Sequence, residues 1–220
     1  MKLTKTEIAE LSEARAMDPA LLEMVCNVEA PNGGHLPDGR PVILFEGHKF
    51  YEYLPGSVRK AVAAKYPTLC HAKWSRQHYM GGAAEHDKRL AVAAEIDREA
   101  ALMACSWGRP QILGKNYQAA GFGTLQAFIN AMYKPEKFHI NAMITFIRSW
   151  PKQAAALNAI PAYTGKTDAE KVADLIERCN AFAACYNGPG HAANQYGPKM
   201  AKEYLRLTGQ PALAKLIKLK

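Results

Sequence analysis

The chain lacks several features that would place it in a specialised class of protein. Its 220 residues contain no apolar run long enough to cross a bilayer, so no transmembrane helix is expected. Residues 1–10 carry acids and no uninterrupted apolar stretch, so no secretory signal peptide is expected. The five cysteines are an odd number without C-x-x-C spacing, which predicts free thiols rather than a disulfide framework. Internal repeats and low-complexity linkers are also missing, which favours a single domain.

Composition and charge are those of a basic globular protein. Hydrophobic residues make up 49% of the chain and charged residues 22%, enough to build a core and a solvated surface. Lys and Arg outnumber Asp and Glu by 28 to 20, which gives a net charge of +8. This excess favours polyanionic surroundings such as nucleic acid, an anionic membrane or an acidic cell-wall polymer. Charge alone does not distinguish among these three.

Two helices are expected at the start of the chain. A Thr-x-x-Glu capping box predicts a helix over residues 8–16, and an Asp-Pro dipeptide predicts a second helix over residues 19–30. The second segment has apolar residues at helical spacing and is followed by Pro-Asn-Gly-Gly at 31–34, which ends the helix. Glu29 is therefore expected in the last turn of a buried helix, next to a backbone break.

The next segment carries the clearest β signal. A Pro-Asp-Gly turn at residues 37–39 precedes an apolar and aromatic run that Glu46 closes, which predicts a strand and a small β-hairpin. Residues 55–85 indicate short helix and loop. Five further helical segments are expected: 86–105, 124–133, 136–149, 168–185 and 191–207. The predicted fold class is mainly α (α+β), with one small β-hairpin after the second helix.

Three motifs, in this order along the chain, carry a resemblance to known enzymes. "SWGRPQILG" (106–114) resembles the Ser-x-Gly-x-x-Gln segment of goose-type lysozymes and lytic transglycosylases, and "CYNGPG" (185–190) resembles their Tyr-Asn-x-Gly turn. "LPDGRPVILFEGHKF" and "DREAALMACSWGRPQILGKNY" look similar to the N-acetylmuramidase family of phage endolysins. The resemblance runs from about Ala20 to Leu207. It implies a lysozyme-like fold and one muramidase domain over residues 1–220, without a separate wall-binding domain.

The resemblance implies that Glu29 is the catalytic acid. Such an acid must keep its proton near neutral pH, which requires partial burial among apolar neighbours. The negative end of the helix dipole raises the pKa in the same direction. The alternative is an ordinary exposed glutamate at a helix end. Two departures from the family pattern are Ala30, where relatives often have Ser, and Arg109-Pro110, where Leu-Phe or Leu-Met is usual.

The sequence leaves the identity of a second catalytic carboxylate open. Glu46, at the end of the predicted strand, could return beside Glu29, whereas Asp38 already has a turn-forming role in Pro-Asp-Gly. A third possibility is a mechanism with one acid. A base that activates water predicts inversion at the sugar carbon, and a nucleophile predicts retention.

Six further residues are candidates for binding the substrate: Ser106, Trp107, Gln111, Tyr117, Tyr186 and Asn187. Ser106 could orient Glu29 or cap a turn, and Tyr186 could bond to Glu29 or line the cleft. The side chains of Gln111 and Asn187 could hydrogen-bond sugar N-acetyl groups. Trp107 could stack on a sugar or belong to the core. The seven histidines show no paired metal spacing, so neither a metal nor a cofactor is expected.

The expected function is peptidoglycan hydrolysis at the β-1,4 bond between N-acetylmuramic acid and N-acetylglucosamine. The alternatives are a lytic transglycosylase, a basic nucleic-acid-binding protein and an inactive wall-binding module. The resemblance implies an endolysin that accumulates in the host cytoplasm and reaches the periplasm after a holin opens the membrane. The sequence carries no oligomer signal, so a monomer is the default expectation. The tail "LAKLIKLK" (213–220) predicts a basic helix that either contacts an anionic outer membrane or docks on the core.

Overall fold

A computed structural model describes residues 3–219 and divides the chain into two compact units. The first unit comprises residues 33–143, and the second comprises residues 3–32 with 144–219. Helix α8 (Glu136–Arg148) begins in the first unit and ends in the second. Within the described part of the chain, every helix is too short or too polar to span a membrane.

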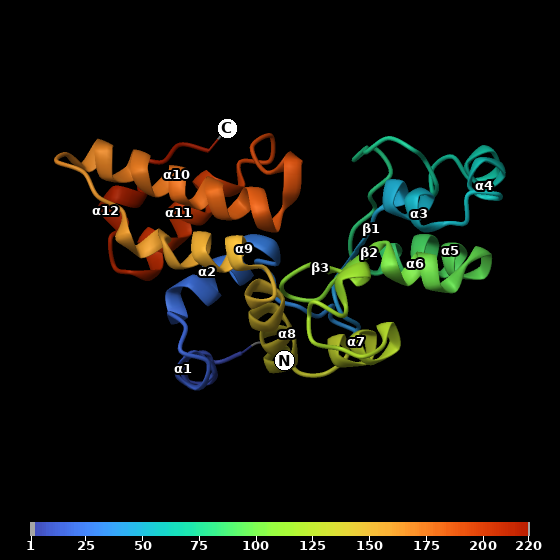
Figure 1. Ribbon diagram of the computed structural model, residues 1–220, viewed down its shortest axis with the longest axis horizontal. Coiled ribbons are helices and arrows are strands. Elements are labelled where there is room, and N and C mark those ends of the chain that lie inside the picture. The colour runs from blue at the N-terminus through green and yellow to red at the C-terminus, as the bar shows by residue number, and fades with distance from the viewer. Residues whose placement is uncertain (1–2, 220) are drawn as a thin grey trace. The chain divides into compact units, whose positions relative to one another are not determined.

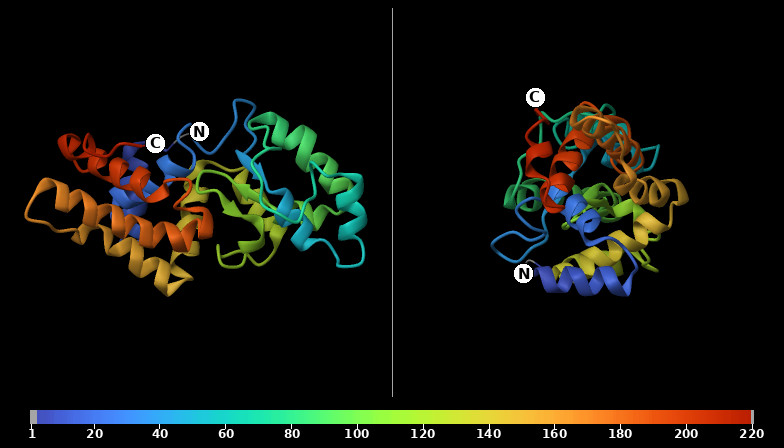
Figure 2. Two further views of the ribbon diagram at one scale, coloured as in Figure 1. Left: turned by 90° about the horizontal axis from the view of Figure 1, so that it is seen from above. Right: turned by 90° about the vertical axis from the view of Figure 1, so that its left-hand side faces the viewer.

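The second unit is helical, as predicted. Its elements besides the end of α8 are α1 (Lys5–Ala14), α2 (Pro19–Glu29), α9 (Pro151–Asn158), η3 (Ile160–Ala162), α10 (Asp168–Tyr186), η4 (Gly188–Gly190), α11 (Tyr196–Leu207) and α12 (Pro211–Ala214). Helices α10 and α11 pack side by side, and α2 packs on α11 (Figures 1 and 2). A hydrogen bond of 2.7 Å from Asn27 to Glu203 joins α2 to α11. This packing fixes the C-terminal end of α2, where Glu29 lies.

The two N-terminal helices confirm their predictions. The capping box between Thr4 and Glu7 is present on α1, and the Asp18 side chain accepts a hydrogen bond from the backbone N–H of Ala20 at the start of α2. One face of α2 is buried, through Leu21, Leu22, Met24, Val25 and Cys26. The helix ends on Glu29, because Ala30 already has a non-helical backbone.

Two details of the second unit differ from the predictions. Helix α9 was not expected, although Pro151 occupies its first turn, where proline is favoured. Helix α11 begins at Tyr196 rather than at residue 191, because Gln195 before it has a left-handed backbone with φ of 56°. Across both units, all five cysteines are free, as expected.

The predicted basic helix over residues 213–220 is wrong. Helix α12 ends at Ala214, and the following residues are not helical. Ile217 is buried and its carbonyl accepts a hydrogen bond from Lys202, which anchors the segment in a non-helical course. Leu216 and Leu219 are exposed. Lys220, which completed the predicted helix, lies outside the described residues.

The first unit contains a small sheet with helices around it. Its elements are β1 (Ile43–Phe45), α3 (Gly47–Tyr53), α4 (Arg59–Lys65), the π-helix η1 (Glu85–Leu90), α5 (Ala91–Ile96), α6 (Arg98–Met103), β2 (Cys105–Trp107), β3 (Ile112–Leu113), η2 (Gly114–Asn116), α7 (Leu125–Met132) and the start of α8. The strands are antiparallel in the order β1-β2-β3, with Leu44 opposite Ser106. This mainly helical fold with one small sheet confirms the predicted fold class.

The predicted β-hairpin around the Pro-Asp-Gly turn is wrong in its strands. Only an isolated bridge joins His35 to Pro41, and β1 pairs instead with β2 in the Ser-Trp-Gly motif. The segment after Glu46 forms helix α3. Phe50 and Leu54 are four residues apart and both fully buried, which is a helical pattern within an aromatic stretch.

Candidate functional site

Glu29 lies at the C-terminal end of α2 and accepts a hydrogen bond from Asn187. The Asn187 Nδ2 atom donates to the Glu29 Oε1 atom at 2.6 Å. Asn187 is itself the residue that ends α10, so two helix termini fix this pair. The Tyr-Asn-x-Gly motif therefore supplies a donor to the predicted acid through Asn187, a residue that was expected to bind sugar.

The electrostatic surroundings of Glu29 favour its protonated form. Although part of the residue's surface stays accessible, burial is the largest influence on the carboxyl and raises its pKa to about 7. The Asn187 hydrogen bond and the positive charge of Lys199 act in the opposite direction, but they are weaker. The helix dipole adds to the effect of burial, because the negative end of α2 lies beside the carboxyl. A large fraction of Glu29 therefore keeps its proton at neutral pH, as a general acid requires.

Tyr186 precedes Asn187 at the end of α10 and belongs to an aromatic cluster. Its ring centre lies 5.3 Å from that of Phe182 and 5.8 Å from that of Phe146. Burial, followed by the negative charge of Glu29, holds the pKa of the Tyr186 phenol well above its usual range. The phenol therefore stays protonated near Glu29. The Asn187 Oδ1 atom is enclosed and has no hydrogen-bond partner among residues 3–219.

Glu46 directly follows β1 and occupies the N-cap position of α3. Its side chain is 19% exposed and accepts a hydrogen bond from the Ser106 Oγ atom at 3.1 Å. The His48 Nε2 atom lies 3.7 Å from the other carboxylate oxygen. Burial raises the pKa of Glu46, and the Ser106 bond and Lys49 lower it to a smaller degree. The sheet creates this pair, because β1 and β2 lie side by side.

Ser106 takes neither of its two predicted roles, whereas Trp107 follows one of the two interpretations of its position. Ser106 bonds to Glu46, whereas the sequence suggested that it would orient Glu29 or cap a turn. Trp107 is 1% exposed, and its indole N–H donates to the Leu102 carbonyl at 3.1 Å. Its ring therefore belongs to the core, which was the alternative to stacking on a sugar.

Gln111 and Tyr117 lie on either side of β3. Gln111 has a left-handed backbone with φ of 50°, and its side-chain amide donates to the Gly108 carbonyl at 2.7 Å. The same amide lies 3.4 Å from the Val42 carbonyl, so it holds its own turn. Its amide oxygen is the group that could meet a substrate. Tyr117 is half-buried just after η2.

Asp38 is fully engaged in its turn. Its carboxylate lies 2.7 Å from the Arg40 guanidinium and accepts a hydrogen bond from the Arg40 backbone N–H. These contacts with Arg40 hold the pKa of Asp38 below its usual range. The turn-forming interpretation of Asp38 therefore fits the structure. Among residues 3–219, no three histidine, cysteine or acidic side chains are grouped to hold a metal ion.

One buried ion pair behind Glu46 was not predicted. Glu85 and Arg89 are 0% and 2% exposed, and their charged groups lie 3.0 Å apart. Glu85 accepts from the Phe45 backbone N–H at 3.1 Å, and Arg89 donates to the Phe45 carbonyl at 2.7 Å. The pair thus holds the residue before Glu46 at both backbone groups. Its spacing of four residues was the available signal, but the same spacing is common on exposed helices.

A second unpredicted cluster surrounds His139, which is fully buried. The Arg109 backbone N–H donates to its Nδ1 atom at 3.1 Å, and its Nε2 atom bonds to the Met132 carbonyl at 2.8 Å. Burial lowers the pKa of His139 to about 4. Beside it, the buried Glu136 accepts from the Gly34 backbone N–H at 2.5 Å. The cluster fixes the turn that contains Gln111, and nothing in the local sequence indicates it.

Comparison with known proteins identifies the family of this chain. The family model described as N-acetylmuramidase matches residues 18–208, which include parts of both units. Among solved structures, the chain is similar to the crystal structure of Burkholderia AP3 phage endolysin, with 33% sequence identity and a TM-score of 0.73. That match covers 94% of this chain and 72% of the endolysin chain. A search of curated proteins gives no match. The chain belongs to the N-acetylmuramidase family and is a glycoside hydrolase of peptidoglycan.

Proposed function

We propose that the enzyme cleaves the β-1,4 bond between N-acetylmuramic acid and N-acetylglucosamine, with Glu29 as the general acid. The observation that carries this proposal is the raised pKa of Glu29, about 7, at the end of a buried helix. Glycosidic cleavage needs a proton on the leaving oxygen as the sugar becomes oxocarbenium-like. Asn187 orients the carboxyl that delivers this proton, and its free Oδ1 atom can accept from an N-acetyl N–H of the sugar.

We propose Glu46 as the second carboxylate. As a base it removes a proton from the attacking water, and its bond from Ser106 fixes the direction of its lone pairs. Burial of Glu46 raises its proton affinity, which suits a base once the carboxylate is ionised. A base of this kind gives the inverted anomer, a covalent glycosyl-enzyme gives the retained one, and attack by the sugar's own hydroxyl gives anhydro ends. Gln111, Tyr117 and Tyr186 remain candidates for binding sugar.

The test is the release of muropeptides from isolated peptidoglycan by Glu29→Gln. We expect a loss of at least about a hundredfold with a folded protein, because the isosteric amide keeps the Asn187 bond and cannot donate an acidic proton. Glu23→Gln, on the same helix, is the matched control and should keep its activity. A Glu29→Gln variant with a tenth of the wild-type rate or more would remove Glu29 from this role. Mass spectrometry of the products distinguishes hydrolysis from formation of anhydro ends.

We also propose that residues from both units form one catalytic domain that acts as a monomer. The family match supports this, because residues 18–208 run through both units. By analogy with the phage endolysin it resembles, the enzyme would act on the host wall in the periplasm after a holin opens the membrane. Light scattering tests the monomer, and lysis by expression with and without a holin tests the route.

For the tail we propose contact with an anionic outer membrane. Leu216 and Leu219 are exposed beside Lys215 and Lys218, whereas Ile217 anchors the segment. Apolar side chains flanked by lysines suit a surface of anionic lipid. Sedimentation with vesicles of phosphatidylglycerol should retain the wild type and release a Leu216→Ser variant. Equal binding by both proteins would assign the exposed leucines no such role.

A further inference from the structure

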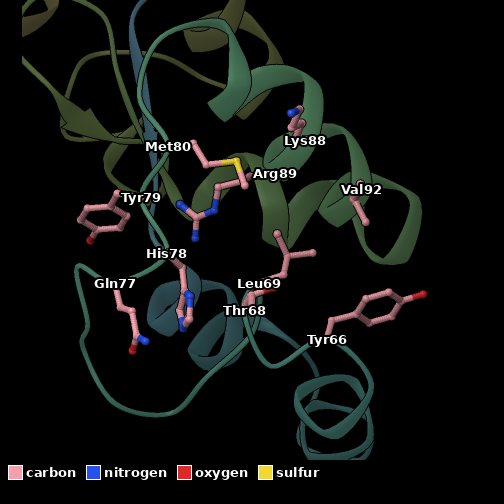
Figure 3. A pocket seen from close by; sticks show the side chains of 10 residues that line it. All are labelled: Tyr66, Thr68, Leu69, Gln77, His78, Tyr79, Met80, Lys88, Arg89 and Val92. Atoms are coloured by element: carbon pink, nitrogen blue, oxygen red, sulfur yellow. The ribbon is translucent and has the colours of Figure 1, made fainter.

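The first unit contains a cavity of about 430 Å³ that the proposed reaction does not use. Ten residues line it: Tyr66, Thr68, Leu69, Gln77, His78, Tyr79, Met80, Lys88, Arg89 and Val92. Figure 3 shows the loop residues from Gln77 to Met80 on one side of Arg89, and Lys88 and Val92 on the other. This volume lies within the range of small-ligand pockets.

Arg89 is the buried polar group of this cavity. Its Nη1 atom donates to the Phe45 carbonyl and to Glu85, but its enclosed Nη2 atom has no hydrogen-bond partner within the described residues. The guanidinium lies 5.0 Å from the ring centre of Phe45 and 5.5 Å from that of Tyr79. Unpaired donors of a buried cation are costly, so a ligand that accepts a hydrogen bond from Nη2 would be favoured.

The cavity wall is held in place before any ligand arrives. Glu85 is fully buried, and one of its oxygens accepts from the backbone N–H groups of Met80 and Gly81, at 2.7 and 3.2 Å. The loop that carries His78 and Tyr79 is thereby tied to the same ion pair as Arg89. These residues pair within and beside a π-helical turn, a geometry that is frequent at functional sites. The side chain of Arg89 is consequently preorganised.

The charge and surface of the lining indicate the ligand. Lys88 and Arg89 are cationic, and none of the ten described residues that line the cavity is acidic. Leu69, Met80 and Val92 provide apolar surface beside these cations. The Arg89 Nη2 group can donate a charge-assisted hydrogen bond to a carboxylate, and the apolar side chains suit contact with an alanine methyl. The lining thus suits a short peptide that ends in a carboxylate.

We propose that this cavity binds the C-terminal carboxylate of a peptidoglycan stem peptide. The proposal rests on the proposed function, because it takes its ligand from the same polymer whose sugar bond is cleaved. Arg89 receives the carboxylate at Nη2, Lys88 adds positive charge at the rim, and the apolar wall contacts the terminal D-alanine. The cavity then adds a preference for glycan that carries peptides.

Direct binding is the first test, because it does not depend on catalysis. A stem tetrapeptide ending in D-alanine should bind the whole protein in calorimetry, and its C-terminal carboxamide should bind at least about tenfold more weakly. Lys88→Gln should weaken the tetrapeptide about two- to fivefold, and Lys60→Gln, an exposed lysine outside the cavity, should not. Arg89→Lys should abolish detectable binding. If the Arg89→Lys variant is unfolded, the test consists of the other two comparisons, the tetrapeptide against its carboxamide and wild type against Lys88→Gln.

The proposal is overturned if the tetrapeptide and its carboxamide bind equally, or if no tetrapeptide binding occurs at millimolar concentration. If inorganic phosphate binds the cavity as tightly as the tetrapeptide does, the peptide assignment is overturned in favour of a phosphate ligand. A second arm compares hydrolysis of intact and peptide-free glycan, where wild type should show a severalfold higher KM on peptide-free glycan with kcat unchanged. Lys88→Gln should reduce this difference. Failure of Glu29→Gln to lose activity would overturn the proposed function while leaving the binding result intact.

Discussion

Replacing Glu29 with Gln should stabilise the protein at high pH while it removes activity. The pKa of Glu29 is about 7 in the folded protein and 4.5 in a model unfolded chain. The folded state therefore binds this proton more tightly, so stability is lost as pH rises from the lower value to the higher one. Gln carries no titrating proton and keeps an oxygen that can accept from Asn187. The variant escapes this loss.

The size of the effect follows from the two pKa values. A difference of about 2.5 units corresponds to about 3 kcal/mol above pH 8, where both states are ionised. Near pH 5 the stability lost through Glu29 is only about 1 kcal/mol, because this pH is just above the unfolded pKa and well below the folded one. The free energy of unfolding of Glu29→Gln relative to wild type should thus increase by about 2 kcal/mol between these pH values.

Urea unfolding at about pH 5 and pH 8.5, monitored by circular dichroism, measures this difference. Glu23→Gln removes a carboxylate from the same helix and should not reproduce the pH dependence. The reasoning is refuted if Glu29→Gln differs from wild type by the same amount at both pH values. A Glu29 carboxyl that is easily ionised would give that result, and it could not hold a proton for catalysis at neutral pH.

Three further predictions test neighbouring groups. Asn187→Ala removes a donor that lowers the pKa of Glu29, so the alkaline limb of the kcat/KM profile, expected near pH 7, should move to higher pH. Glu46→Gln should reduce muropeptide release at least about a hundredfold if Glu46 is the base, whereas a loss of less than about tenfold supports a single-acid mechanism. Protonation of His139 should destabilise the fold: its pKa of about 4 lies below the unfolded value of 6.5, so stability is complete above pH 6.5 and falls by about 3 kcal/mol as the pH drops to 4. His139→Gln, which can still donate to the Met132 carbonyl, should show a shallower fall in acid-unfolding experiments.

Local signals in the sequence predicted the two N-terminal helices and the position of Glu29. The capping box at Thr4 and the Asp18-Pro19 start act over three or four residues, so they can be read without knowledge of the fold. The same holds for the end of α2, where the backbone leaves the helix after Glu29. Pairings far apart along the chain could not be predicted in this way. The partner of β1 is β2, about 60 residues away, so a local hairpin was the wrong expectation.

The same distinction between local signals and long-range contacts applies to the candidate site. Glu29 and Asn187 were each identified as candidates, but the bond between them spans 158 positions and was not predicted. Ser106 was predicted to orient Glu29 or to cap a turn, and its bond to Glu46 was missed because only the sheet brings the two residues together. The core position of Trp107 depends on packing around its whole ring. A motif can identify such a residue but does not determine which neighbour it meets.

The two buried carboxylates that hold the backbone have different partners from the two carboxylates that we propose as catalytic. Glu85 and Glu136 are buried, lie against Arg89 and Arg109, and accept hydrogen bonds from backbone N–H groups. Glu29 and Glu46 accept instead from neutral donors, the Asn187 amide and the Ser106 hydroxyl. A neutral donor orients a carboxyl without adding a full positive charge, so burial can still raise the pKa of both groups. An arginine introduced at Asn187 should accordingly lower the pKa of Glu29 and shift the alkaline limb of activity to lower pH, which would turn a proton donor into another structural carboxylate.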